Sequence, residues 1–457
     1  MLSGCTVGPN YVAPALNVPS KWVAAPGLPK TAAVKNPTNT WWKAFHDPVL
    51  NQLIATGVAN NLDLKISKAR ILQARANELN AFAQLFPELE GAGIATRIQP
   101  GFISLNKQFD LSQIYFDASW ELDLFGGKRR KLAAEKDFVS VKIEENNDLL
   151  ISLVAEVASN YIEVRKNQRL LQVTHKNIQS ANTHFKITSS LQRAGISTGL
   201  DVVQAKAQYQ NFQSEISLQK IALDAAKNRL TTLLGLNPGS LDKLLVNNAP
   251  KIPVFNDRVL LATPADMIRQ RPDIRKAERT LAGQTELIGE AIAHLFPTVS
   301  LGGFYGQQTT TLISPISIWG VVPKFSVPLL DFARIQSKIN LARARECEAF
   351  FQYKNTVLHA LEDVENQIST YANLKQRKQF LTQSTSSNQS ALNLSSELYK
   401  KGLTTFINVT QSEGLLLRAQ IAEISTAADQ AKRIIAIYKS LGVHPFPDNV
   451  VASRSFK

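Results

Sequence analysis

The stretch that decides the fold is Arg193–Gln204, RAGISTGLDVVQ, because a similar stretch, Lys400–Gln411, KKGLTTFINVTQ, follows it 207 positions later. In each copy a glycine, Gly195 or Gly402, comes two residues after a cation, as expected of the left-handed residue that ends a helix. A Ser or Thr two positions further on is suited to cap the next helix. Each stretch is therefore predicted to be a turn between two long helices.

The repeat extends beyond the turns. Leu85–Pro87 recurs as Leu295–Pro297, and the Leu-Gly pair that ends at Gly235 recurs at Gly442. A repeat of this length indicates a duplicated unit, in which each half buries its apolar faces against copies of itself.

Composition limits the class of protein. The chain has 457 residues, 44% of them hydrophobic and only 8% aromatic, which is typical of long helices with thin cores. The formal net charge is +14, but the cations are scattered beside Glu, Gln and Asn, so nucleic-acid binding is not expected. No stretch of about 18 apolar residues occurs, so no transmembrane helix is predicted.

The two cysteines differ in their surroundings. Leu2–Cys5, LSGC, is similar to a bacterial lipobox, which predicts acylation of Cys5. The charged and apolar parts of a signal peptide are missing before it, so either the start was trimmed or the match is accidental and Cys5 is an exposed thiol. Cys347 lies on a helical pattern and is expected to be packed and inert. No CxxC occurs, so neither a disulfide framework nor a metal site is predicted.

Residues 1–46 form an N-terminal segment, most of it Pro-rich and predicted to be an extended strap. Trp41 and Trp42 end it, and they either pack the strap against the next helix or lie at a membrane interface. From Asp47 an apolar periodicity predicts one helix to about Gln84, and the first-copy helix region is residues 47–87.

Two pairs of strands are predicted, in residues 88–122 and 298–328. Alternation places on one face Ile114, Phe116, Ala118, Trp120 and Leu122, and in the second pair Trp319, Val321, Phe325 and Val327. Such runs match membrane β-barrel strands, although a soluble half-buried sheet alternates in the same way. Four strands cannot close a barrel and open edges cannot sit in lipid, so a barrel requires several subunits to contribute strands.

A helical pattern begins near Phe125–Lys131 and lasts until Gly195, which at about 1.5 Å per residue is a rod on the order of 90 Å long. Its basic start either touches acidic lipid headgroups or is a solvated helix end. Apolar residues recur every seven positions, at Leu150, Val157, Val164, Leu171, Ile178 and Phe185. This spacing predicts coiled-coil packing. The interleaved row turns polar toward the turn, at Gln168, His175 and Asn182, and is expected to meet water or a partner there.

The remaining divisions follow the duplication. We expect a first helical hairpin over 123–235, a connector over 236–263, a second-copy helix over 264–297, a second hairpin over 329–442 and a tail over 443–457.

Motifs for catalysis are missing. The six histidines form no HExxH or carboxylate-flanked cluster in the sequence. There is no third glycine after Gly91-Ala92-Gly93, no Walker motif and no GxSxG. The sequence therefore predicts no enzyme, no cofactor and no metal.

Several spaced motifs together carry a family resemblance, from Cys5 to about Pro445. They are the lipobox with Val7–Tyr11, the Trp pair, Leu85–Pro87, Trp120–Gly126, Arg271–Ile274 and the two glycine turns. In this order they resemble the TolC-like outer-membrane efflux proteins, and among those the lipid-anchored NodT/OprM-like branch.

The resemblance implies a mainly α protein with a β-barrel part. Duplicated long helical hairpins would form a periplasmic tunnel, and four strands per chain would complete a twelve-stranded outer-membrane barrel in a homotrimer. The lipid-anchored trimer would passively conduct small molecules, such as drugs, toxic compounds or metal ions, to the outside. It would receive them from a periplasmic adaptor and an inner-membrane resistance-nodulation-division pump. A soluble periplasmic scaffold or adaptor without a channel is the alternative from another class.

The helix turns would close the inner end of the tunnel. Ile407 and Gln411 lie one helical turn apart just past Gly402 and are expected to ring this aperture, unless Ile407 only packs against the neighbouring hairpin. Related channels carry an acidic and then a basic residue here, whereas this chain has Gln411 and Gly414, so a charged latch at these positions is not predicted.

Overall fold

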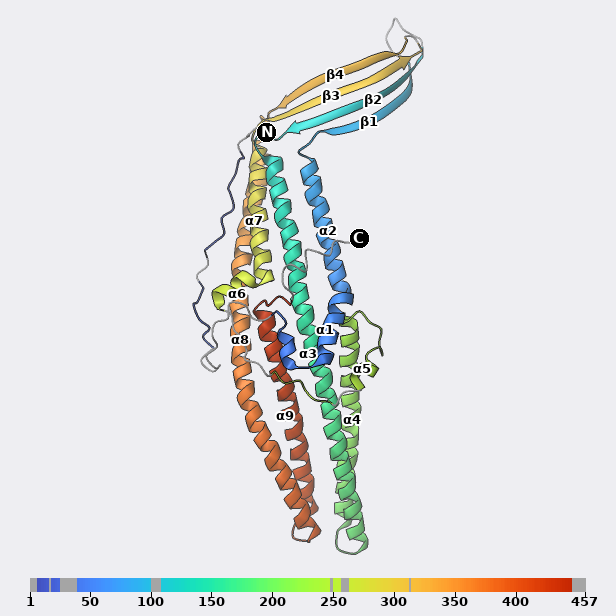
Figure 1. The fold of residues 1–457 in the computed structure, drawn as a ribbon, viewed down its shortest axis with the longest axis vertical. Helices are drawn as coiled ribbons and strands as arrows, with labels where there is room; N and C mark the ends of the chain where they lie inside the picture. The colour runs from blue at the N-terminus through green and yellow to red at the C-terminus, as the bar shows by residue number, and fades with distance from the viewer. Residues whose placement is uncertain are drawn as a thin grey trace. The chain divides into compact units, whose positions relative to one another are not determined.

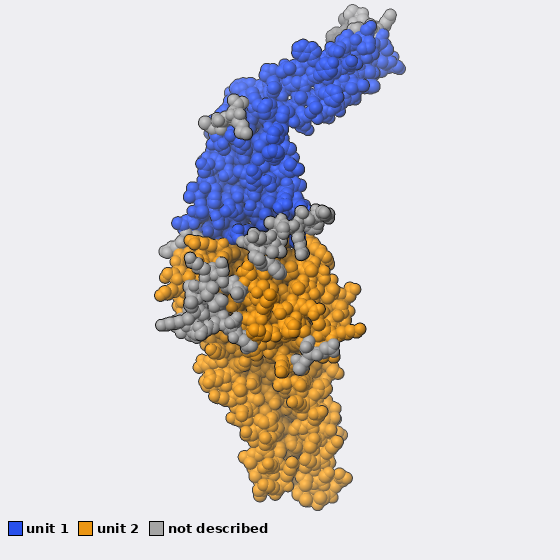
Figure 2. All heavy atoms as spheres, in the orientation of Figure 1, with its two compact units in different colours: residues 1–16, 67–145, 273–357 blue, residues 17–66, 146–272, 358–457 orange. Residues whose placement is uncertain are grey.

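The computed structural model describes residues 6–15, 18–24, 39–99, 108–246, 250–255, 263–311 and 314–445. Cys5 and the tail after residue 445 lie outside the described residues. The chain divides into two compact units (Figure 2). The first contains residues 1–16, 67–145 and 273–357, and the second contains residues 17–66, 146–272 and 358–457.

Long helices dominate the described residues (Figure 1). In chain order the helices and strands are η2 (Trp41–Phe45), α1 (Pro48–Asn60), α2 (Leu62–Ala83), β1 (Glu88–Ile98), β2 (Phe109–Leu122), α3 (Gly127–Arg193), α4 (Gly199–Leu233), α5 (Asp242–Val246), α6 (Pro264–Gln270), α7 (Pro272–Ala293), β3 (Thr298–Thr310), β4 (Ile316–Ser326), α8 (Phe332–Lys400) and α9 (Phe406–Ser440). Within the described ranges, no helix combines the length and the apolar character needed to cross a membrane.

The two predicted turns have the same backbone structure. Gly195 and Gly402 adopt φ of 73° and 72°, and the amide of the following residue donates to a carbonyl five positions back, Ile196 to Leu191 and Leu403 to Leu398, each at 2.9 Å. The cap residue is one position later than expected: Thr198, which forms a capping box with Asp201, begins α4. In the second copy the corresponding Thr405 makes no side-chain cap hydrogen bond.

The strands of the described residues form one antiparallel sheet in the order β1-β2-β3-β4. Phe116 of β2 pairs with Tyr305 of β3, which pairs with Trp319 of β4. Because directly paired residues point to the same side, this register places these three aromatic side chains on one face. The opposite face carries Glu90, paired with Asp117.

In the first unit, the described strap residues 6–15 are held by a buried arginine at the start of α3. Arg130 is 5% exposed, pairs with Glu286 at 2.7 Å, and donates to the carbonyl oxygens of Val7 at 3.0 Å and Gly8 at 3.2 Å. Gly8 has φ of 92°, and a Cβ there would lie 2.4 Å from Gly289 Cα. Arg130 in the basic run is therefore neither solvated nor a lipid contact in this unit, because it binds the strap.

In the second unit, the first half of the seven-residue row of α3 is buried, with Leu150 6%, Val157 1% and Val164 0% exposed. The half nearer the turn is only half-buried, at Leu171, Ile178 and Phe185. Trp41 and Trp42 are each 4% exposed, and Trp41 stacks on Tyr438 of α9 with ring centroids 5.4 Å apart. The Trp pair is therefore packed inside this unit, as one interpretation predicted, but the stacking partner of Trp41 lies on α9 and not on the next helix, α1.

Two expectations were wrong. The single helix predicted from Asp47 to Gln84 is interrupted at Asn61, which is 4% exposed. Its side-chain oxygen accepts from the Leu64 amide at 3.0 Å, and its amide donates to the Leu233 carbonyl at 2.9 Å, so it caps α2 while it binds the end of α4. Cys347 is exposed, because it lies one position past the inward-facing row of α8 that includes Ile339 and Ala342.

Candidate functional site

The two helix turns of the second unit contact each other directly. Ser197, just after the first glycine, lies 3.0 Å from the hydroxyl of Tyr399, just before the second glycine. The Tyr399 ring packs edge-to-face on Phe406 with centroids 5.2 Å apart. These contacts join the first hairpin, α3–α4, to the second, α8–α9.

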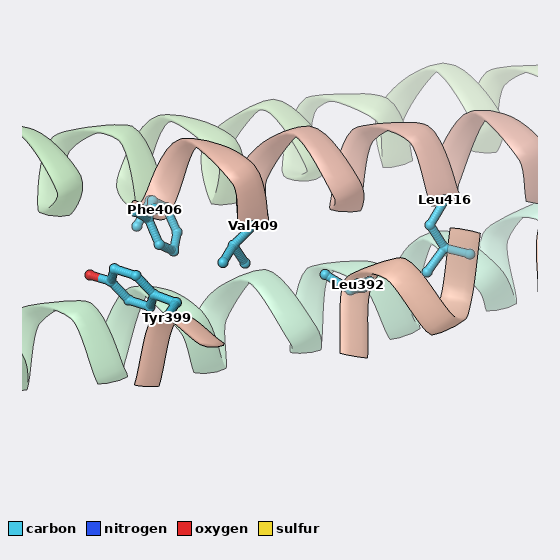
Figure 3. Packing of buried hydrophobic residues seen from close by; sticks show 6 residues of the cluster. Leu392, Tyr399, Phe406, Val409 and Leu416 are labelled. Carbon is cyan, nitrogen blue, oxygen red and sulfur yellow. The ribbon is translucent and has the colours of Figure 1, made fainter. Parts of the chain in front are cut away.

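One apolar cluster holds the turn ends of these helices together (Figure 3). Its buried members are Ala205 of α4, Leu392 and Tyr399 of α8, and Phe406, Val409 and Leu416 of α9. Phe185 and Leu191 of α3 pack against it. Because all four helices contribute, displacing either hairpin from the other exposes apolar surface to water.

The predicted aperture residues lie on the outer side of this cluster. Ile407 is 56% exposed and Gln411 is also exposed, whereas Phe406 and Val409 beside them are 1% and 0% exposed. Ile407 and Gln411 thus share an open face at the start of α9, and within one chain neither is used for packing. A Cβ added at Gly402 would meet nothing within 4 Å, so only its positive φ requires glycine.

The sequence analysis missed a buried polar contact within the span of this cluster. His184 Nδ1 of α3 lies 2.6 Å from Glu413 Oε1 of α9, and His184 Nε2 lies 3.3 Å from Ser396 Oγ of α8. The sequence feature that could have revealed this contact is Glu413, a charged residue at an inward position of α9 between Val409 and Leu416. In the polar row expected on α3 to meet water or a partner, His175 is exposed, as predicted, and Gln168 and Asn182 are half-buried. Thr174 and Thr188 of the same helix are each 0% exposed.

Farther along the same helices, Glu163 of α3 pairs with Lys432 of α9 and with Lys166 of its own helix. Partial burial opposes ionisation of this carboxyl, but the hydrogen bonds and charges of Lys166 and Lys432 outweigh it, so the pKa of Glu163 lies below its ordinary value. The two hairpins are therefore joined by this ion pair as well as by the polar contact between His184 and Glu413.

Comparison with known proteins identifies the family of this fold. The family model described as outer membrane efflux protein matches residues 53–236 and 263–443. The chain belongs to this family. It is an outer-membrane efflux channel protein that extends into the periplasm, and the helical hairpins with a four-stranded sheet are the TolC-like fold that the sequence predicted.

The individual relatives cover nearly the whole chain. Nodulation protein T of Rhizobium leguminosarum bv. trifolii is 30% identical over 445 residues, 96% of this chain and 94% of the relative. The antibiotic efflux pump outer membrane protein ArpC of Pseudomonas putida is 27% identical, over 97% of this chain and 93% of that protein. The solved structure of the outer-membrane channel OprN is 30% identical with a TM-score of 0.89, and the match covers 97% of this chain and 100% of OprN.

Proposed function

We propose that three copies of this chain assemble into one channel, in which three four-stranded sheets close a single twelve-stranded barrel in the outer membrane. The helical hairpins continue it as a tunnel in the periplasm. The observation that carries this proposal is the sheet, which ends in two edge strands, β1 and β4, without a partner strand among the described residues. Unpaired edge groups are not tolerated in lipid, so copies of the chain must pair β1 with β4.

The helices of the first unit supply a second argument for assembly. Apolar side chains stay exposed along α2 and the residues after it, with Leu72 50%, Leu79 65% and Phe86 54% exposed. A row of large apolar residues on one helix is normally covered. In a trimer, helices of the neighbouring subunit would cover it.

Cross-linking between edge strands tests the trimer. In a Cys347→Ser background, Ala95→Cys on β1 is combined in turn with cysteines around Val321 on β4, and the purified outer membranes are oxidised. Both positions lie on the apolar face of the sheet, so dimer and trimer bands are expected for at least one β4 position.

The control uses Ser112→Cys with Thr309→Cys, which are paired in the same chain, so this cross-link must stay at monomer mass. If the whole β4 series gives only monomer while this control cross-links, the closed trimer is wrong.

The cargo and partners follow from the same proposal. Two relatives are named for efflux of antibiotics and of cations, and this chain would pass small molecules of that kind, such as drugs, toxic compounds or metal ions. A passive channel needs an energy source elsewhere, so the turns would meet a periplasmic adaptor and an inner-membrane pump of the resistance-nodulation-division type. Co-expression with candidate adaptor–pump pairs, followed by export assays, identifies the cargo.

Cys5 is proposed to carry the lipid anchor. Thr6, the next residue, packs against Gly126 at the junction of β2 and α3, which supports an anchor near that end of the sheet. Expressed behind a bacterial signal peptide, the Cys5→Ser variant should lose labelling by a fatty-acid probe. Cys347→Ser serves as the control and should keep it. Equal labelling of Cys5→Ser and the unmodified chain would contradict the anchor.

Ile407 and Gln411 are proposed to line the inner aperture, with Gly195 and Gly402 at the helix-turn tips beside it. Their shared exposed face at the start of α9 supports this. In planar bilayers, the double variant Ile407→Ala with Gln411→Ala should conduct markedly better than the unmodified channel. Asn408→Ala, an exposed neighbour turned by about 100° around α9 from Ile407, is the control. Unchanged conductance of the double variant would place the constriction elsewhere.

A further inference from the structure

The two edge strands of the sheet reach the helices at the same end. Neighbouring strands alternate in direction from β1 to β4, so β1 and β4 are antiparallel to each other. β1 begins just after α2 and β4 ends just before α8, so both of these ends lie at the helical end of the sheet (Figure 1). In a ring of identical subunits, the end of β4 therefore lies beside the start of β1 of the next copy.

The start of β1 carries carboxylates without a matching cation. Glu88 and Glu90 are exposed and lie on the face opposite to the apolar one, together with Asp117 and Glu121 of β2. Of these four, only Glu121 makes an ion pair within the described ranges, with Lys128 at 3.7 Å. Glu90 lies directly opposite Asp117, and like charges in that arrangement destabilise a strand pair. The start of β1 is therefore short of positive charge.

The end of β4 carries the complementary charge. Lys324 lies on the same face as these carboxylates, because it is four positions from Gly320, which the register aligns with Phe304 and Asp117. Lys324 is exposed, its neighbour on β3 is Ser300, and it makes no ion pair with any side chain that the structure describes. One edge of each copy thus offers a cation, and the other edge offers carboxylates, at the same end of the sheet.

We propose that Lys324 of one copy pairs with Glu90 of the next copy and sets the register of the seam between β4 and β1. This inference rests on the proposed trimer and names the contact that joins its subunits. Opposite residues on adjacent strands share a face, and an ion pair between them stabilises the pairing. The partner at this edge is therefore a second copy of the chain.

The apolar face supports the same register. With Lys324 opposite Glu90, the adjacent residues Phe325 and Leu89 come opposite each other, and they are 67% and 70% exposed in one chain. Cross-strand contact between two large apolar side chains adds to the stability of the seam. Shifting the register by two positions, so that Glu88 faces Lys324, would instead place Pro87 opposite Phe325. Only the register with Glu90 matches both the charges and the apolar residues.

The segments that join these strands to the helices also fit this seam. Leu330 and Phe332, after β4, are 98% and 66% exposed, and Phe86, before β1, is 54% exposed. Counting outward from the pair of Lys324 and Glu90, Pro328 comes opposite Phe86, so both apolar segments leave the sheet side by side. Large apolar residues gathered in one place are normally covered, and neighbouring copies would cover each other here.

A carbodiimide tests the contact in the whole protein in detergent. The reagent activates a carboxylate, and a lysine amine that touches it displaces the activating group to form an amide, so only paired side chains are joined. Bands at dimer and trimer mass are expected, and their digest should contain a peptide that joins Lys324 to Glu90. Lys324→Gln and Glu90→Gln should each lose this peptide.

Two matched variants serve as controls. Glu88→Gln, two positions away on the same face, and Lys338→Gln, an exposed lysine of α8, should both keep the linked peptide. Joining of Lys324 to Glu88, or to Glu121 of its own chain, would overturn the register. Joined products that stay at monomer mass would overturn the seam, because lipid or another protein would then meet this edge.

Charge reversal measures what the pair contributes. Lys324→Glu should lower the ratio of trimer to monomer in detergent roughly three- to a hundredfold, because each of three seams loses a factor of about 1.4 to 5. Combining Lys324→Glu with Glu90→Lys should restore the trimer, and Lys338→Glu should leave it unchanged. A double variant as weak as Lys324→Glu alone would contradict the pair.

The result can be separated from that of the proposed channel. This register places Ala95 opposite Trp319, so Trp319→Cys should cross-link best with Ala95→Cys in the cysteine series. Trimer bands in that series without the peptide that joins Lys324 to Glu90 would overturn the register and leave the channel standing. The linked peptide in a protein that stops at dimers would support the seam and overturn the closed trimer.

Discussion

Replacing Phe406 with Ala should loosen the turn ends of the two hairpins while the rest of the second unit stays folded. Phe406 is 1% exposed, belongs to the apolar cluster shared by all four helices, and packs edge-to-face on Tyr399. Truncating a buried Phe to Ala removes its burial and leaves a cavity, which together cost about 3–5 kcal/mol. The lost aromatic pair is included in that range.

Hydrogen exchange measured by mass spectrometry reports this loss locally. At about 1.4 kcal/mol per factor of ten, the amides in the first turns of α9 should exchange roughly a hundredfold to several thousandfold faster than in the unmodified chain. Amides around Trp41 and Tyr438, at the other end of α9, should keep their protection, because their stacking does not involve the cluster.

The neighbouring residue supplies the control. Ile407 is 56% exposed, so Ile407→Ala should alter stability by no more than about 0.5 kcal/mol and leave exchange in α9 nearly unchanged. Equal acceleration in both variants would refute the assignment of Phe406 to packing and Ile407 to the open face.

Three further predictions concern other parts of the chain. Trp319→Arg, on the apolar face in mid-strand, should destabilise the protein by about 2–4 kcal/mol and reduce the amount recovered from outer membranes. Ile318→Arg, on the opposite face, should not, and equal recovery of the two variants would contradict the face assignment. Asn61→Ala should lower the unfolding free energy by about 2–4 kcal/mol, because it removes the cap of α2 and the hydrogen bond to the Leu233 carbonyl. Thermal denaturation measures this loss, and Asn60→Ala, at an exposed position, should not show it. Glu163→Gln should lower the unfolding free energy by about 1–2 kcal/mol at pH 7. Because folding lowers the pKa of Glu163, this contribution is fully present above the ordinary Glu pKa of about 4.3 and is lost as the pH falls through the lowered pKa of the folded chain. A difference between the two chains that does not shrink in acid would count against the ion pair.

Much of this fold could be predicted from the sequence because strand alternation, glycine turns and helix periodicity each depend on residues that are close together in the chain. Alternation in β2 identified the apolar face to which Phe116 and Trp120 belong, and the register then placed Trp319 on the same side. The glycine turns could be located because a positive φ after a helix strongly favours glycine. The recurrence of apolar residues at every seventh position of α3 identified Val157 and Val164 as core residues before their neighbours were known.

The errors arose where a distant residue decides the outcome. Asn61 ends a helix because it also binds Leu233, 172 positions away, and no local periodicity carries that information. His184 and Glu413 are 229 positions apart, so the search for histidines with carboxylates nearby in sequence could not pair them. Cys347 was assigned to the wrong side of α8 because a shift of one position along a helix turns a side chain by about 100°.

The hydrogen bonds between Arg130 and the strap determine when the strap can dock during folding. Gly8 lies against Gly289 and Arg130 pairs with Glu286, so the strap cannot dock until α7 has been synthesised and has crossed the inner membrane. Until then the first residues of the chain remain undocked and accessible to enzymes that act on them. Docking is a late, long-range step that depends on the second half of the chain. Truncations after α4 should therefore leave the N-terminal segment sensitive to protease, even where α3 has formed.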